Sequence, residues 1–81
     1  MAIYIQLQRT DDDATLSIYE FGPSECIVGS VAVTKPTGEV ELIHIDAEYE
    51  PKKDFYLSRI RRVFQRHSQT GDFPERTCYA A

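Results

Sequence analysis

Apolar and polar residues alternate in four successive segments of the chain, and a single helical pattern follows them. In the first segment, residues 2–9, Ile3, Ile5 and Leu7 alternate with Tyr4 and polar residues. A period of two is typical of a β-strand with one buried face. Segments 14–21, 26–35 and 39–46 show the same kind of pattern, so the sequence predicts four strands.

Turn residues separate these strands. The acidic run at residues 10–13 predicts a turn, because aspartate side chains accept hydrogen bonds from nearby backbone amides. Residues 22–25, which include glycine and proline, predict a second turn. The strand at 26–35 is apolar on both faces, which is typical of a central strand. Its Gly29 predicts either a bulge or a large side chain lying across the strand.

The turn at residues 35–38 leaves two registers open for the last hairpin. A two-residue loop pairs Val33 with Val40, whereas a three-residue loop with a bulge pairs Thr34 with Val40. The better match of apolar side chains favours the first register.

One amphipathic helix is predicted over residues 51–68. Pro51 suits its first turn, where the missing amide would be unpaired in any case. The apolar stripe consists of Tyr56, Ile60, Val63, Phe64 and His67. Gly71 predicts its end. The large side chains among residues 72–81 predict an ordered tail that docks on the rest of the chain.

These elements predict an α+β fold of two layers in a single small domain, residues 1–81. A four-stranded antiparallel meander packs on one C-terminal helix, and an ordered C-terminal tail completes it. The helix is the only cover available for the apolar face of the sheet. The strand residues expected to face it are Ile3, Ile5, Leu7, Leu16 and Ile18. The aromatic residues expected on the opposite, exposed face are Tyr4, Tyr19 and Phe21.

Charge is divided unevenly along the chain. Residues 1–50 carry ten acidic and two basic side chains, whereas residues 51–81 carry three acidic and seven basic ones. Arg59, Arg62 and Arg66 lie on one side of the predicted helix. Such an asymmetry marks either a binding surface or two elements that attract each other within the fold. Arginines that are exposed and unpaired would favour the binding surface.

The sequence contains no recognised motif for catalysis, a metal site or a cofactor. Its cysteines and histidines, Cys26, His44, His67 and Cys78, are scattered, whereas zinc ligands usually come in close pairs. The three aspartates at 11–13 do not continue into a calcium loop of about twelve residues. We therefore expect a protein that is not an enzyme and that holds no metal and no cofactor.

Our first hypothesis is a small non-enzymatic protein-interaction module of the inhibitor, antidote or accessory-subunit type. Its partner would be another protein or a second copy of the chain. Tyrosine and arginine are enriched at the energetic centres of interfaces. The candidate binding residues are therefore Tyr4, Tyr19 and Phe21 on the sheet and Arg59, Arg62 and Arg66 on the helix.

Two other hypotheses belong to different classes. A weak nucleic-acid-binding domain would use the helix arginines on phosphates, although the net charge of −4 disfavours this. An enzyme subunit completed by another chain would require a polar cluster around His44. No segment predicts a membrane span or a signal peptide, so the expected location is the cytoplasm, most simply of a bacterium.

Overall fold

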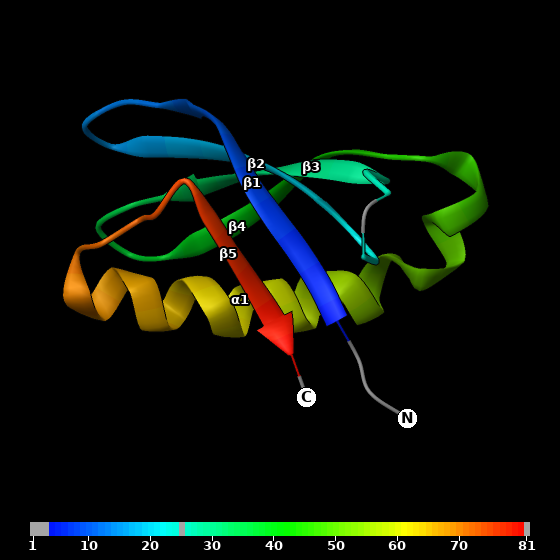
Figure 1. The fold of residues 1–81 in the computed structure, drawn as a ribbon. Helices are drawn as coiled ribbons and strands as arrows, with labels where there is room; N and C mark the ends of the chain where they lie inside the picture. The colour runs from blue at the N-terminus through cyan, green and yellow to red at the C-terminus, as the bar shows by residue number, and fades with distance from the viewer. Residues whose placement is uncertain (1–3, 25, 81) are drawn as a thin grey trace.

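The computed structural model describes residues 4–24 and 26–80 of the chain. Ala2 and Ile3 of the predicted first strand and Glu25 of the predicted second turn lie outside the described residues. The described elements are β1 (Tyr4–Asp12), β2 (Leu16–Gly22), β3 (Gly29–Thr34), β4 (Glu39–Ile45), the 3₁₀ helix η1 (Ala47–Lys52), α1 (Lys53–Thr70) and β5 (Arg76–Ala80). Figure 1 shows α1 lying across one face of the antiparallel sheet, which confirms the α+β fold.

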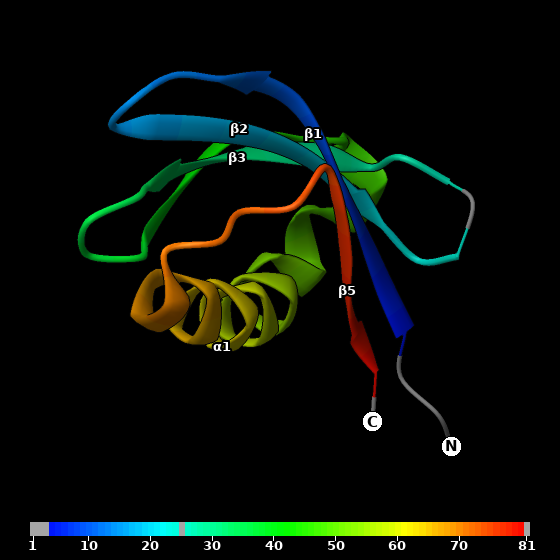
Figure 2. The same ribbon diagram turned by 60° about the vertical axis from the view of Figure 1, so that its left-hand side comes forward.

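The sheet has the order β4-β3-β2-β1-β5. The predicted meander accounts for β1 to β4, and the predicted ordered tail ends in a fifth strand that pairs antiparallel with β1. β3 is an interior strand, as its apolar faces indicate, but β2 occupies the centre of the sheet. Figures 1 and 2 show β5 crossing the flank of α1, with β1 on its other side.

The turn between β1 and β2 begins later than predicted, because β1 continues to Asp12. A register shift between Arg9 and Asp11 introduces a bulge that lets the acidic segment stay in the ladder. The side chain of Asp13 then accepts hydrogen bonds from the backbone amides of Thr15 and Leu16, each at 2.8 Å. The hydrogen bonding of an aspartate side chain to nearby backbone amides, predicted for this turn, is therefore confirmed at Asp13.

The predicted orientation of the second strand is wrong. Tyr19 and Phe21 face the helix and are 0% exposed, whereas Leu16 is exposed on the open face. Phe21 pairs directly with Leu7, so both side chains share the buried face. The two aromatic rings bury more apolar area than Leu16 and Ile18 would, which favours the observed orientation.

The last hairpin adopts the favoured register, in which Val33 pairs with Val40. Of the two readings of Gly29, the large side chain across the strand is confirmed, whereas the bulge falls on β4. The ring of Phe21 lies across Gly29, which pairs regularly with Ile45, and the register shift between Ser30 and Val31 leaves Ile43 of β4 as the extra residue. A Cβ atom at Gly29 would lie 2.7 Å from Cζ of Phe21 and 2.4 Å from the carbonyl oxygen of His44.

The core lies between α1 and the inner face of the sheet. The helix residues that fill it are Tyr56, Leu57, Ile60, Val63 and Phe64. The rings of Tyr19 and Phe64 are 4.6 Å apart between centroids at the centre of this layer. The segment predicted as the first helical turn is 3₁₀, and the helix ends at Gly71, whose φ of 75° is the left-handed conformation that favours glycine.

Candidate protein-binding surface

The predicted aromatic patch on the open sheet face does not form. Tyr4 is 50% exposed there, but Tyr19 and Phe21 are buried on the opposite face. Of the three aromatic residues predicted to bind a partner, only Tyr4 is therefore accessible. We correct the other two to core residues, because their rings pack against Phe64 and Tyr56 of the helix.

Tyr19 instead anchors the segment that leads into β5. Its hydroxyl donates a hydrogen bond of 2.5 Å to the carbonyl oxygen of Pro74. A guanidinium nitrogen of Arg9 donates one of 2.8 Å to the carbonyl oxygen of Phe73. Burial raises the pKa of Tyr19 to about 12, so this hydroxyl stays protonated and remains a donor. These bonds fix the course of the chain as it enters β5.

Some of the acidic charge in residues 1–50 is paired with a basic side chain within the fold. Asp12 lies 2.5 Å from the ammonium group of Lys35 and accepts a hydrogen bond of 2.5 Å from Ser17. The hydrogen bond from Lys35 is the main cause that holds the pKa of Asp12 below its usual value, and the bond from Ser17 adds to it. The ammonium group of Lys35 is therefore paired with Asp12 within the fold.

The predicted arginine row exists on α1, and its first member is held by the helix itself. The guanidinium carbon of Arg59 lies 3.9 Å from the ring centroid of Phe55. The same side chain donates hydrogen bonds to the Phe55 carbonyl oxygen at 3.3 Å and to the Ser58 hydroxyl at 3.0 Å. This stacking leaves the Phe55 ring partly exposed with a fixed cation over it.

Arg62 and Arg66 differ from Arg59, because both are exposed. Among the residues that the structure describes, no carboxylate lies within 4.0 Å of either guanidinium group. Residues 55, 59, 62 and 66 recur at the spacing of one helix face. Phe55, Arg59, Arg62 and Arg66 form what we call the arginine row.

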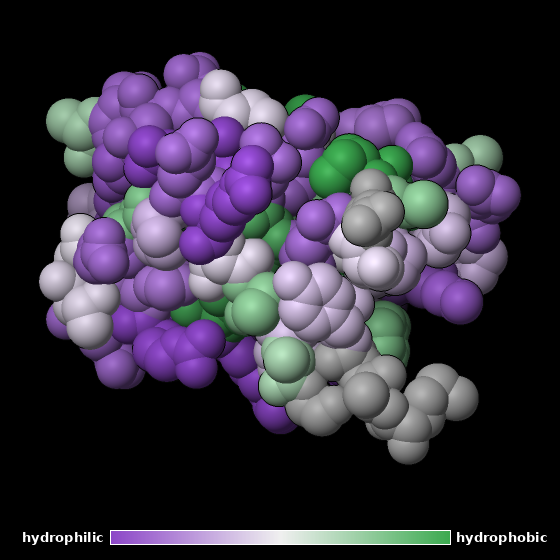
Figure 3. Space-filling view, viewed as in Figure 1, coloured by the Kyte–Doolittle hydropathy of each residue, from purple (hydrophilic) through white to green (hydrophobic). Residues whose placement is uncertain are grey.

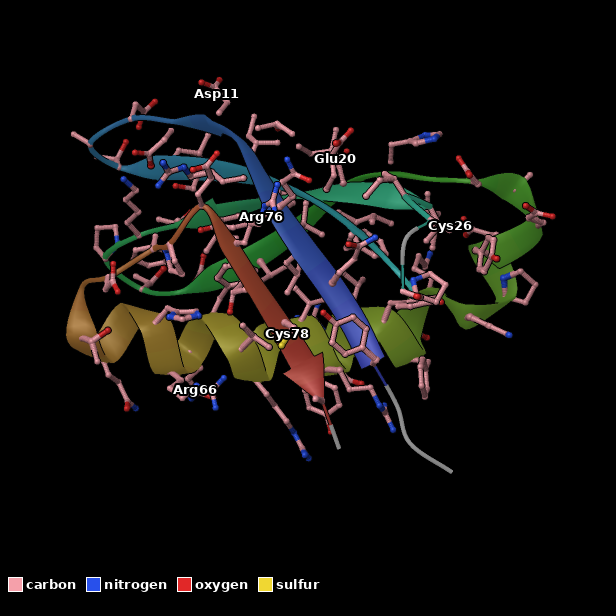
Figure 4. All side chains as sticks on the ribbon, viewed as in Figure 1. Asp11, Glu20, Cys26, Arg66, Arg76 and Cys78 are labelled. Atoms are coloured by element: carbon pink, nitrogen blue, oxygen red, sulfur yellow. The ribbon has the colours of Figure 1, made fainter. Side chains whose placement is uncertain are left out.

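Four of the acidic residues belong to the open face of the sheet. Because directly paired residues share a face of the sheet, the strand register places these side chains on the open face. They are Asp11, Glu20, Glu39 and Glu41. In Figure 4, Asp11 and Glu20 project above the sheet, whereas Arg66 projects from α1 at the bottom of the view. Figure 3 shows that most of the surface in this view is hydrophilic, with smaller apolar areas.

Two grooves flank α1, one along each edge strand. The groove on the β5 side has a volume of about 220 Å³ and is lined by Arg62, Val63, Arg66, Cys78, Tyr79 and Ala80. The groove on the β4 side has a volume of about 540 Å³, and its charged lining residues are Arg61, Glu39 and Glu41. The β5 groove thus carries two cations and no acid among its lining residues, whereas the β4 groove carries both signs.

The histidines and cysteines lie apart. His44 contacts Asp46 at 3.1 Å on the surface, and His67 contacts the hydroxyl of Thr77 at 2.9 Å between α1 and β5. Burial, followed by the charge of Arg66, holds the pKa of His67 below its usual value. Within residues 4–24 and 26–80, no three histidine, cysteine or acidic side chains are grouped to hold a metal ion. No helix of the described part is long and apolar enough to cross a membrane.

Comparison of the chain with protein-family models, with curated proteins and with solved structures finds no match. Sequence reasoning missed Phe55, although its position four residues before Arg59 is a spacing at which helical side chains meet. It also missed the lining residues of β5, because the tail carries no alternation of apolar and polar residues long enough to predict a strand.

Proposed function

We propose that this protein is a non-enzymatic interaction module that binds an acidic segment of another protein through the arginine row. The observation that carries the proposal is the exposure of Arg62 and Arg66 with no carboxylate partner among the described residues. Helix arginines that served only the fold would meet the acids of the sheet. Instead, Asp11 and Glu20 project from the open face of the sheet, and Glu39 and Glu41 line the groove on the other flank of α1 with Arg61.

Phe55 and Arg59 support the same proposal. Arginine and aromatic residues are the types that contribute most at protein interfaces. The stacking of Arg59 on Phe55 fixes both side chains before a partner arrives, so less side-chain entropy is lost on binding. The row therefore combines two exposed cations with a preformed aromatic contact.

Nucleic acid is the alternative ligand for the same cations. The eight residues from Arg59 to Arg66 span about 10 Å of helix, enough to follow a few phosphates. However, two of the three aromatic residues that could have stacked on bases, Tyr19 and Phe21, are buried. The acidic open face also repels a polyanion. These observations favour a protein partner.

Affinity capture with matched charge variants tests the proposal. The immobilised wild-type chain, the double variant Arg62→Ser/Arg66→Ser and the control double variant Lys52→Ser/Arg61→Ser are exposed to nuclease-treated native lysate. Both double variants lose two exposed cations, but the control leaves the row intact. We expect a protein that the wild type and the control retain and that the Arg62/Arg66 variant loses.

Two outcomes contradict the proposal. The first is that the set of retained proteins is the same for all three chains. The second is that the wild type retains a protein only when the nuclease is omitted and that it is retained on heparin with a steep salt dependence, which would assign the row to nucleic acid.

A further inference from the structure

The free edge of β5 lies beside the two unpaired arginines of the row. β5 pairs with β1 on one side, and no described strand pairs with its other side. That other side borders the groove lined by Arg62, Val63 and Arg66. An edge strand offers backbone donors and acceptors to any extended chain that can lie against it.

The backbone groups that point into the groove follow from the ladder. The amide of Arg9 donates a hydrogen bond of 2.8 Å to the carbonyl oxygen of Glu75, in the same register that pairs Leu7 with Thr77. Hydrogen-bonded pairs alternate along antiparallel strands, so Thr77 and Tyr79 turn their backbone groups toward β1. The residues whose backbone groups face the free edge are Arg76, Cys78 and Ala80.

We propose that β5 takes up an extended acidic peptide segment of the partner protein as a sixth strand of the sheet. The new strand would hydrogen-bond to Cys78 while its acidic side chains meet Arg62 and Arg66. This inference rests on the proposed function and adds the conformation of the partner. Main-chain bonds give such a complex its affinity, and the flanking side chains give it specificity.

The two edges of the sheet differ in how well they suit such a strand. β5 pairs with β1 in five consecutive positions without a shift, and Arg76 is its only charged residue. β4 contains a register shift opposite Ser30 and Val31, and it carries Glu39 and Glu41. Bulges and charged residues are features that protect a sheet edge from added strands. The β5 edge lacks a bulge and has cations beside it, so it fits an acidic strand.

A second copy of the chain is a poor occupant of this edge. Pairing β5 with β5 of another copy would bring Arg62 and Arg66 of both molecules to the same side of the joined sheet. Like charges placed opposite each other across a sheet or an interface are destabilising. The charge around the groove therefore selects a different chain, and an acidic one.

The test uses a fluorescent seven-residue peptide that alternates glutamate with valine, together with the same peptide carrying lysine in place of glutamate. Binding to the full chain is measured by fluorescence anisotropy at low salt. We expect the glutamate peptide to bind at least tenfold more tightly than the lysine peptide. We expect Arg62→Ser and Arg66→Ser each to weaken binding of the glutamate peptide about three- to tenfold, because each removes a facing charge.

Arg61→Ser is the matched control. It makes the same change on an exposed residue of the same helix, but it lines the other groove. We expect it to change the affinity less than twofold. Circular dichroism and urea unfolding verify that all three variants remain folded.

Two further measurements separate strand addition from simple charge attraction. The glutamate peptide is N-methylated at alternate residues, in each of the two phases, and strand addition predicts at least tenfold weaker binding for one phase or both. Amide exchange of Cys78 is expected to slow at least tenfold when the unmethylated peptide binds. The amide of Tyr79, already directed toward β1, serves as the internal reference and is expected to change little.

The remaining outcomes overturn the inference in distinguishable ways. If both methylated peptides bind as well as the parent and Cys78 stays unprotected, the strand is wrong while the arginine row still binds acidic protein. If the glutamate peptide fails to bind at low salt, the β5 site is wrong, and the lysate capture decides separately whether the row has a partner. If the chain alone sediments as a dimer with Cys78 protected, a second copy occupies the edge.

Discussion

The hydroxyl of Tyr19 provides a sharp test of how the tail is held. Tyr19→Phe keeps the ring, which is 0% exposed and packs on Phe64, and removes only the donor of the 2.5 Å bond to Pro74. Loss of one such bond lowers the free energy of unfolding by about 1–1.5 kcal/mol, since the half-buried carbonyl loses its protein partner. With an m-value of about 1 kcal/mol per molar urea, the midpoint should fall by about 1 M.

The matched control for this prediction is Tyr4→Phe. Tyr4 is 50% exposed, and its hydroxyl makes no hydrogen bond to another described residue, so the expected change is within about 0.5 kcal/mol. Equilibrium urea unfolding followed by circular dichroism measures both variants. An unchanged midpoint for Tyr19→Phe, or an equal decrease for Tyr4→Phe, would refute the reasoning.

Three further predictions concern the core and its titration. Gly29→Ala should lower the free energy of unfolding by about 2–3 kcal/mol, since the new Cβ would lie 2.7 Å from the Phe21 ring; a neutral result in urea unfolding would contradict that packing. Ile60→Ala, at a site that is 0% exposed, should cost about 3 kcal/mol, against about 0.5 kcal/mol or less for the exposed control Ile43→Ala; equal effects would contradict the assigned core. The pKa of His67 is lowered from 6.5 in the folded state, so the unfolded chain binds more protons just below pH 6.5. The free energy of unfolding should therefore fall as the pH drops from 7 through 6.5, and His67→Gln should make this pH dependence smaller. An equal pH dependence in the variant would refute its assignment to His67.

The two layers of the fold were predictable because long periodic patterns of apolar residues indicate the helix and the sheet. The helix stripe repeats over three turns, and only one amphipathic helix was available to cover the sheet. The orientation of the second strand was not predictable from alternation alone, since Leu16 and Ile18 on one face compete with Tyr19 and Phe21 on the other. Packing decided between them, because the aromatic pair fills the space beside Gly29 and Phe64.

β5 illustrates a different limit of sequence reasoning. Arg76–Ala80 is five residues long and has no clear alternation, and its half-buried residues do not mark one face. Its conformation depends on tertiary contacts, namely the hydrogen bonds to Phe73 and Pro74 and the ladder with β1. A pattern in the sequence predicts an element that buries its own face, whereas an edge strand of this kind is held by its neighbours.

Part of the charge asymmetry of the sequence corresponds to two separate surfaces of the molecule. Lys35 pairs with Asp12, Arg9 donates a hydrogen bond to Phe73, and Glu39 and Glu41 share a groove with Arg61. Asp11 and Glu20, by contrast, project from the open sheet face, away from the arginine row. Packed layers lie roughly 10 Å apart, about one screening length at physiological salt, so the two faces neutralise each other little. A second copy could set its acidic face on the row, but such a head-to-tail contact would build a ring or an open chain of copies. A partner that supplies a single acidic strand satisfies Arg62 and Arg66 and caps the edge of β5 in one step.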